Sequence, residues 1–221
     1  MGKVSKKIIS CFMLCALMMS SVIGFAINSN AADMDGIRNQ REDGTYVYCV
    51  NTQSSLGKAV RSANDGDCIE FIDDIVYCGS LYVNKDITID FNDNSLRFIN
   101  TSNGLYVNVD KSKEVTLKNG AIYGADDSNS TVHACDGKVN LKCMDIYGGD
   151  CKHVDYYWGN GIYVCPQSQI CLDDCLVMGG NGYRKKDNYD TRTCKAIFYG
   201  KVISEGKGYT AIDGECGPNK K

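Results

Sequence analysis

The chain has 221 residues, with 24 Lys and Arg against 27 Asp and Glu, for a formal net charge of −3 at pH 7. This near balance, without a basic stripe interleaved with aromatic residues, argues against a nucleic-acid partner. The length suits one domain with a sizeable buried core, and 23 glycines against two prolines favour a β-rich fold with many tight turns.

The first 31 residues have the layout of a secretory signal peptide. Lys3, Lys6 and Lys7 precede an apolar run over 8–27, and small residues at 29–31 provide a cleavage site. We therefore expect a secreted or cell-surface protein that makes no membrane contact beyond this segment. An uncleaved anchor is the alternative, because the apolar run is about long enough to span a bilayer.

Residues 32–65 predict a strand followed by a capping helix. Residues 46–50 have the character of a strand, and Ser54 or Ser55 is expected to cap the helix that follows. The apolar residues of this helix recur at helical spacing: Leu56, Ala59, Val60 and Ala63. Such an amphipathic helix would cover the open end of a stack of strands.

One ten-residue phrase occurs three times downstream. It spans 115–124, 139–148 and 170–179, with apolar residues at its first, third and eighth positions and a glycine at its tenth. The starts lie 24 and 31 residues apart, and alternating apolar residues at such a period are typical of a solenoid of stacked strands. Residues 66–221 are therefore predicted to form an all-β parallel β-helix. A β-sandwich is the alternative, but it needs hairpin turns that are hard to place at these uneven intervals.

The solenoid prediction places equivalent residues of the three phrases in inward-facing columns. Val115, Val139 and Ile170 would form one column on adjacent parallel strands. A second column would contain the leucines at the third position of each phrase: Leu117, Leu141 and Leu172. One phrase alone has no partner for its apolar face, so the copies depend on each other.

Several segments resemble the pectate-lyase-like right-handed β-helix proteins. Residues 55–69 resemble the family's entry segment, in which a capping helix leads through a small-x-Gly-Asp-x-Ile turn into the first strand. Residues 87–90 and 115–120 resemble its recurring coil phrases. The resemblance covers roughly residues 46–212 and implies a right-handed parallel β-helix with an N-terminal capping helix. Because the family contains lyases, hydrolases, adhesins and inactive modules, it implies a fold rather than an activity.

The chain has 13 cysteines, of which 11 follow the signal segment, so at least one is a free thiol or bonds another chain. Aligning the repeats puts Asn108, Cys135 and Cys165 at one position, which makes the two cysteines neighbours within disulfide reach. Export favours disulfides, whereas the alternative is that many of these cysteines are small buried hydrophobic residues. A metal site of cysteines is not indicated, because no C-x-x-C pair occurs.

The glycine that ends each phrase opens a loop, and register between the phrases would bring the three loops side by side. These edge loops cover residues 125–130, 149–160 and 180–193. Loops on a rigid scaffold are where binding sites usually lie. The edge loops also hold the only tryptophan of the chain, Trp158, and a dense group of charges.

Three groups of residues on the edge loops are candidates for function. Four aspartates are candidate ligands for a calcium ion shared with a uronate, because hard oxygen ligands suit this metal: Asp126, Asp127, Asp150 and Asp155. Aromatic side chains offer flat faces for sugar rings: Tyr156, Tyr157, Trp158, Tyr183 and Tyr189. Four basic residues of the third loop would hold an acidic sugar or act as a base: Arg184, Lys185, Lys186 and Arg192. Of these, Arg184 and Lys185 are the catalytic candidates. The alternative for each group is ordinary: solvated carboxylates, aromatics packed under their own loops, and a solvated charge run.

These features predict a module that binds a polysaccharide or cell-surface glycan through its edge loops, without catalysis. A small calcium-dependent uronate lyase is the alternative, because pectate lyases pair calcium-binding aspartates with an arginine or lysine base. Trp158 is followed by Gly159 and Asn160, however, and not by the Trp-x-Asp-His of many lyases. A purely structural adhesin or surface module is the third hypothesis.

Overall fold

The computed structural model describes residues 37–150, 159–184, 190–193, 197–198, 201–204 and 211–212, and the side chains of 38–150 and 159–180. All of these belong to the compact unit Asp35–Lys221. The predicted signal peptide, residues 1–31, lies outside the described residues. Within the described ranges, no helix has both the length and the apolar character needed to cross a membrane.

The described chain is almost entirely β, with one short helix, α2 (Gln53–Ser62). The N-terminal half contains β1 (Ile37–Gln40), β2 (Tyr46–Val50), β3 (Cys68–Phe71), β4 (Ile75–Cys78), β5 (Leu81–Val83), β6 (Thr88–Asp90), β7 (Ser95–Ile99) and β8 (Asn103–Asn108). The repeat phrases follow in β9 (Glu114–Tyr123), β10 (Ser130–Tyr147), β11 (Asn160–Val164), β12 (Ser168–Asp173) and β13 (Leu176–Met178). The last strands are β14 (Asn181–Arg184), β15 (Asp190–Thr193), β16 (Ile197–Phe198), β17 (Lys201–Ser204) and β18 (Ala211–Ile212).

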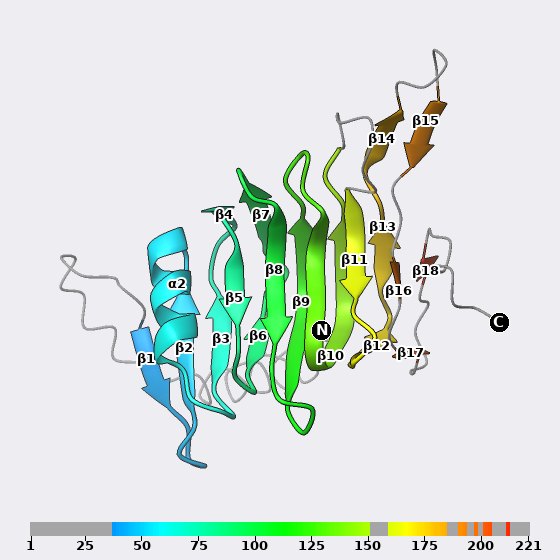
Figure 1. Cartoon of the computed structure of the whole chain (residues 1–221). Helices are drawn as coiled ribbons and strands as arrows, with labels where there is room; N and C mark the ends of the chain where they lie inside the picture. Colours follow the sequence, from blue (N-terminus) through cyan, green and yellow to red (C-terminus); the bar gives the residue numbers. More distant parts are fainter. Residues whose placement is uncertain are drawn as a thin grey trace, which may run out of the picture. The chain divides into compact units, whose positions relative to one another are not determined.

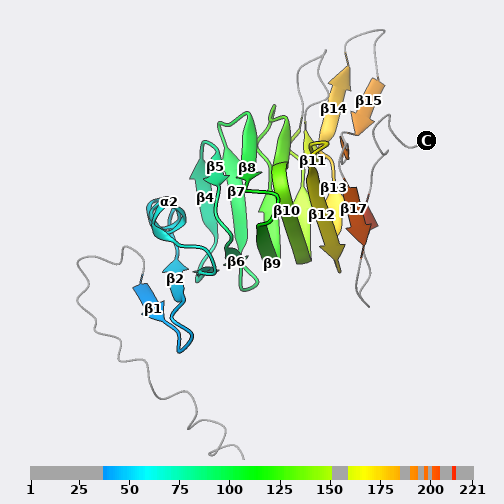
Figure 2. The same ribbon diagram turned by 60° about the horizontal axis from the view of Figure 1, so that its bottom comes forward.

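Sixteen of these strands form one curled mixed sheet, and β14 pairs with β15 in a separate antiparallel hairpin. Within the large sheet β1 pairs with β2 antiparallel, whereas the remaining described pairs are parallel. The strands follow one another across the sheet roughly in chain order, as Figures 1 and 2 show. The all-β prediction with an N-terminal helix is therefore confirmed at this level.

The predicted inward column of the repeat phrases is confirmed. Val139 on β10 lies opposite Val115 on β9 and Ile170 on β12, in parallel register on both sides. The leucine column holds in the same way, with Leu141 between Leu117 and Leu172. All six side chains are fully buried. Removing one such leucine side chain would cost about 2–5 kcal/mol, so the columns hold the sheet together.

Helix α2 is capped by Thr52, which corrects the prediction of Ser54 or Ser55. Thr52 has an extended backbone, and its Oγ1 accepts a hydrogen bond from the Ser55 amide at 3.1 Å. Ser55 instead completes a capping box, because its Oγ accepts from the Thr52 amide at 3.0 Å. Both serine and threonine can cap a helix, and the residue with the extended backbone, Thr52, is the one that does so here. The predicted apolar residues of the helix are all buried.

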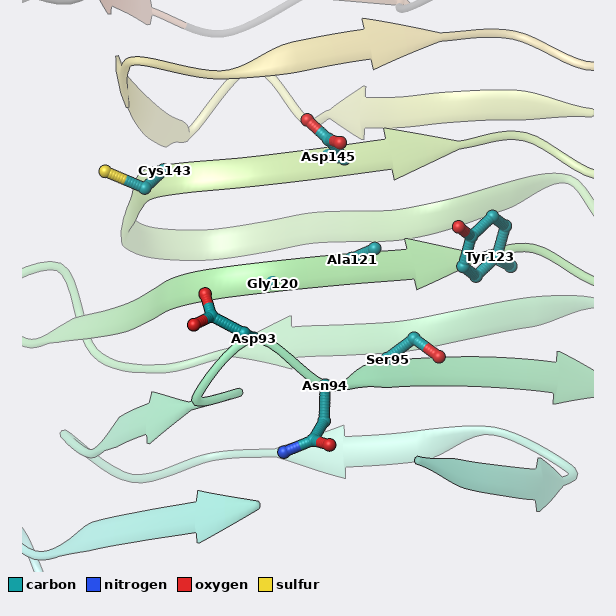
Figure 3. Close-up of a pocket in the computed structure, with 8 residues that line it drawn as sticks. All are labelled: Asp93, Asn94, Ser95, Gly120, Ala121, Tyr123, Cys143 and Asp145. Atoms are coloured by element: carbon teal, nitrogen blue, oxygen red, sulfur yellow. The ribbon is translucent and has the colours of Figure 1, made fainter. Parts of the chain in front are cut away.

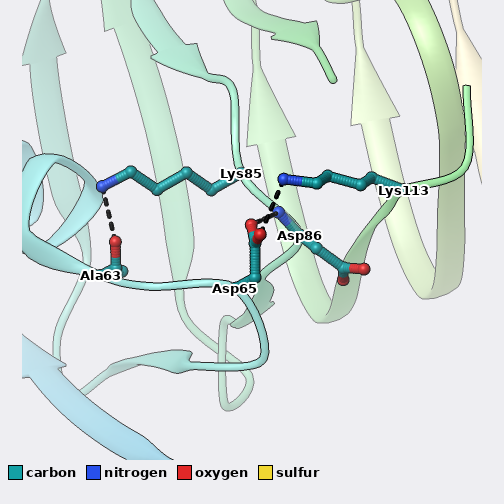
Figure 4. A network of polar contacts seen from close by, with 5 residues as sticks. All are labelled: Ala63, Asp65, Lys85, Asp86 and Lys113. Atoms are coloured by element: carbon teal, nitrogen blue, oxygen red, sulfur yellow. Dashed lines mark hydrogen bonds and ion pairs between the residues drawn. The ribbon is translucent and has the colours of Figure 1, made fainter. Parts of the chain in front are cut away.

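The C-terminal end of α2 is tied to the turns of the neighbouring strands by two lysines (Figure 4). Lys85 Nζ donates to the carbonyl oxygens of Arg61 and Ala63, at 2.6 and 2.5 Å. These are carbonyls that a helix end leaves without an intrahelical donor. Asp65 accepts from the Asp86 amide at 2.9 Å and pairs with Lys113 Nζ at 2.7 Å. The last turn of α2 is thus attached to the turns of the neighbouring strands.

We expect Lys85→Met to lower the free energy of unfolding by about 1–2 kcal/mol, because it leaves the helix-end carbonyls without a charged donor. Lys113→Met is the matched control, since it removes an exposed ion pair of the same network and should change stability much less. Urea denaturation followed by circular dichroism measures both. Equal losses in the two variants would contradict the special role of Lys85.

Each repeat phrase contains a corner at its fifth residue. Asn119, Cys143 and Asp174 all have left-handed backbone conformations, with φ of 59°, 52° and 53°. Asparagine and aspartate tolerate this region better than other residues with a Cβ atom, whereas cysteine has no such advantage. The middle corner therefore carries a residue that is less suited to its backbone than its two neighbours.

Replacing Cys143 by asparagine should raise the free energy of unfolding by about 1 kcal/mol, because asparagine accepts the left-handed conformation more readily. Cys143 is exposed, so the substitution disturbs no packing. Cys143→Val should instead lower stability, since a β-branched residue resists this backbone most strongly. Denaturation midpoints in the order Asn, Cys, Val would agree with the corner argument, and any other order would refute it.

Candidate functional site

Most of the predicted edge-loop residues lie outside the described part of the chain. This holds for Asp155, Tyr156, Tyr157, Trp158, Lys185 and Tyr189. Tyr183 and Arg184 lie on β14, opposite Thr191 and Asp190 of β15. The third edge loop is therefore partly a β-hairpin, which the sequence analysis treated as a loop throughout. The roles predicted for these residues stay predictions.

The described parts of the edge loops do lie side by side. The Gly124 amide donates to the Tyr147 carbonyl and the Gly148 amide to the Met178 carbonyl, both at 2.8 Å. The approach is so close that a Cβ atom at Gly149 would overlap the backbone of Ala125. Glycine is needed there to let neighbouring turns meet. The predicted juxtaposition of the loops is confirmed for these residues.

The loop aspartates are brought together only in part. The Asp150 amide donates to a carboxylate oxygen of Asp126 at 3.3 Å, and the Asp127 amide donates to the Asp150 carbonyl at 2.8 Å. Among the residues that the structure describes, no group of three or more His, Cys, Asp or Glu side chains is arranged to hold a metal ion. The predicted calcium site depends on Asp155, which is not described, and it stays a prediction.

A shallow depression on the outer face of the sheet is a candidate site (Figure 3). Its volume is about 340 Å³, and residues from three levels of the sheet line it: Asp93, Asn94, Ser95, Gly120, Ala121, Tyr123, Cys143 and Asp145. We call it the strand pocket. Ala121 lies in register between Ser95 and Asp145, so a methyl group stands between two polar residues. The small side chain of Ala121 leaves the space that forms the pocket.

Aromatic stacking positions one end of the strand pocket. The Tyr123 ring is stacked on the Tyr147 ring with centroids 5.0 Å apart, and the Arg97 guanidinium carbon lies 4.4 Å from the Tyr123 centroid. Neighbouring residues of the register column therefore cover Tyr123 on both sides. A ring held in this way has little freedom to move, so its hydroxyl is presented at a defined place.

The strand pocket is acidic. Two carboxylates, of Asp93 and Asp145, belong to its lining, which contains no lysine or arginine. Tyr147 Oη donates to Asp145 at 3.4 Å. Burial and the neighbouring Asp145 charge raise the pKa of Tyr147 above its usual value, because both oppose the phenolate. The pocket therefore offers hydrogen-bond acceptors of negative charge beside a tyrosine that stays protonated.

A second group of side chains lies on the outer face of the strands β5, β8, β10 and β11. Tyr82, Tyr106, His133 and Tyr163 follow one another in register. The rings of Tyr106 and His133, and of His133 and Tyr163, are stacked with centroids 4.8 Å apart. The two tyrosines cover the ring faces of His133, so only the edge of the imidazole, with its nitrogens, can contact other groups.

The sequence analysis missed both groups because their residues lie on strands whose alternation was interpreted as structural. The signal was present for the aromatic residues, since rings recur at the same outward position of successive repeats. Tyr123 and Tyr147, for example, are the ninth residues of two phrases. Reading the outward positions as columns, as was done for the inward ones, would have found this pair.

Comparison with known proteins yields no match, whether to protein-family models, curated proteins or solved structures. The resemblance to pectate-lyase-like proteins therefore stays a prediction from sequence. The assignment of a site depends on the geometry alone.

We expect Asp145→Asn to bring the pKa of Tyr147 down toward its usual value, because the substitution removes a negative charge that opposes ionisation. Part of the increase should remain, since burial is its larger cause. NMR titration of ring-labelled tyrosine measures the change, with Asp110→Asn on an exposed turn as the control. An unchanged Tyr147 titration in Asp145→Asn would show that the carboxylate does not face the phenol.

Proposed function

We propose that this chain is a secreted or cell-surface right-handed parallel β-helix module that binds a polysaccharide without catalysis. The strand pocket is the observation that carries the binding proposal, because it places carboxylates and a fixed tyrosine on one rigid sheet. Export and handedness come from the sequence pattern and the family resemblance. The solenoid and the ligand are argued in the following paragraphs.

The pairing of β10 supports the solenoid. The strand has 18 residues, and its first part pairs with β8 and β11. Its middle pairs with β9 and β12, and its last part pairs with β9 and β13. One continuous strand thus contributes to three parallel ladders in turn, as one coil of a β-helix does. Because neighbouring coils repeat the pattern of β10, the segments before and after β10 can form coils of the same kind.

The chemistry of the strand pocket favours a neutral sugar. Carboxylates accept strong hydrogen bonds from the hydroxyl groups of a sugar, and the Tyr123 hydroxyl both donates and accepts. A uronate would place its own carboxylate near Asp93 and Asp145, where like charges repel. The uronate-lyase alternative therefore depends on the edge loops, with their predicted calcium ligands and the predicted base Arg184 or Lys185.

The strand pocket adjoins the first edge loop. Tyr123 forms the end of the pocket, and the next residue, Gly124, opens the first edge loop. A chain of sugar units is long enough to contact both places, whereas a single sugar is not. The predicted aromatic residues, Trp158 among them, would then extend the site, which is why a polymer is proposed as the ligand.

Affinity electrophoresis through gels that contain a neutral polysaccharide or a polyuronate tests the proposal. We expect retention in neutral glycans, weakened about tenfold by Asp145→Asn, because one charge-assisted hydrogen bond contributes about 1.5–3 kcal/mol. Ala121→Leu should weaken retention as well, since it fills the pocket. Asp110→Asn is the control and should bind like the parent protein.

Three other results would replace the proposal. Retention that neither pocket variant changes but that Trp158→Ala abolishes would move the site to the edge loops. Formation of an unsaturated uronide with calcium, followed by ultraviolet absorbance and lost in Arg184→Ala, would establish the lyase. The absence of any glycan retention would favour the structural module.

A further inference from the structure

His133 lies at the centre of a group of polar and sulfur-containing side chains that the proposed function does not use. Its Nε2 is 3.5 Å from Sγ of Cys165, the residue after β11, and its Nδ1 is 3.4 Å from Asn103 Oδ1 on β8. Ser130 Oγ lies 3.4 Å from the same Nδ1 and donates to Asn103 Oδ1 at 3.3 Å. Three adjacent strands thus contribute to the surroundings of one imidazole.

These contacts fit one neutral tautomer of His133, with the proton on Nδ1. Asn103 Oδ1 is an acceptor, so Nδ1 is the nitrogen that donates. Nε2 then has a free lone pair, and it faces the thiol of Cys165. The imidazole is therefore oriented to accept a proton from Cys165, with its plane held between the rings of Tyr106 and Tyr163.

A second thiol follows the β10–β11 register pair and lies at a bulge in the pairing of β10 with β8. The register shifts between Ala134 and Asp136, so that Asn108 lies opposite Asp136 and Cys135 is the additional residue. This corrects the predicted alignment of Asn108 with Cys135. On the other side, the Cys165 amide donates to the Ala134 carbonyl at 2.9 Å, which holds β11 against β10 beside the bulge.

The predicted neighbour relation of the two cysteines agrees with these contacts. Cys135 and Cys165 directly follow Ala134 and Val164, which are paired in parallel register, and both cysteines are free and half-buried. Burial and the neighbouring Cys135 raise the pKa of the Cys165 thiol to about 11, and burial lowers the pKa of His133. Both groups are therefore neutral near pH 7. A thiol of this kind reacts only when a base removes its proton during the attack.

We propose that Cys135 and Cys165 form a redox-active dithiol site in which His133 accepts the proton of Cys165. The co-reactant is a disulfide, either of a small thiol such as glutathione or of a protein. Cys165 attacks one sulfur of this disulfide, its proton passes to His133 Nε2, and the leaving thiolate takes up that proton. Cys135 then attacks Cys165 Sγ, loses its own proton and expels the second thiolate, which is protonated in turn. The net change is one Cys135–Cys165 disulfide and two reduced thiols.

An acyl-transfer role for the same cysteine and histidine is less well supported. Such a reaction needs backbone amides free to stabilise an oxyanion near the nucleophile. The Cys165 amide is already engaged by the Ala134 carbonyl. The second thiol on the adjacent strand would also trap Cys165 as a disulfide, which is the reaction proposed here.

The titratable groups that face this site are few among the described residues. Tyr106 and Tyr163 cover the ring of His133, and Cys135 and Cys165 lie beside it. The hydrogen bond with Cys135, together with burial, raises the pKa of Tyr106 to about 12. Tyr106 thus stays protonated below pH 9, and a change in rate between pH 5 and 8 would report on His133.

The test exposes the reduced full chain to oxidised glutathione, blocks the remaining thiols at intervals and identifies the products by peptide mass spectrometry. We expect the Cys135–Cys165 disulfide to form faster than glutathione adducts at the exposed Cys78 and Cys143. Cys135→Ser should accumulate the adduct on Cys165, whereas Cys143→Ser is the control and should behave as the parent.

His133→Ala should slow disulfide formation about 100-fold below pH 8, as expected for the loss of a general base. Added imidazole should restore part of the rate, which a merely structural role would not explain, and circular dichroism verifies the fold. Disulfide formation no faster than modification of Cys78 would overturn the proposal. So would a His133→Ala rate and pH profile equal to those of the parent.

Discussion

Parallel register between neighbouring strands is the constraint on which the rest of this structure depends. Side chains alternate between the two faces of a strand, so a slip by one residue would turn Val139 and Leu141 outward and their polar neighbours inward. β10 takes part in three ladders at once, and its register must satisfy all of them. Burial of the apolar columns therefore determines where every outward residue lies as well.

The outer face acquires its chemistry from this same register. Residues from different repeats, far apart in the sequence, become neighbours in space. Ser95, Ala121 and Asp145 do so around the strand pocket. His133 is placed between Tyr106 and Tyr163 for the same reason. A column that contains one small residue becomes a depression, and a column of rings becomes a stacked ladder. The scaffold is thus uniform, while the composition of each outward column decides what it can bind.

Departures from regular register occur where the chemistry is most distinctive. The bulge at Cys135 adds a residue to β10 relative to β8, next to the position where β10 and β11 bring Cys135 and Cys165 together. The corners at Asn119, Cys143 and Asp174 require a left-handed backbone. Irregularities of this kind are less favourable than a continuous ladder, and the buried columns on either side are what hold them in place.

The sequence by itself determined the inward columns, the apolar face of α2 and the juxtaposition of the edge loops. These follow from local periodicity, and Val115, Val139 and Ile170 repeat it clearly. The tertiary structure alone decided that Thr52 caps the helix, that Asn108 faces Asp136, and that Ala121 opens a pocket between Ser95 and Asp145. Backbone angles and the neighbours of an outward side chain depend on strands 24 to 31 residues away. Only the packed register brings those strands together.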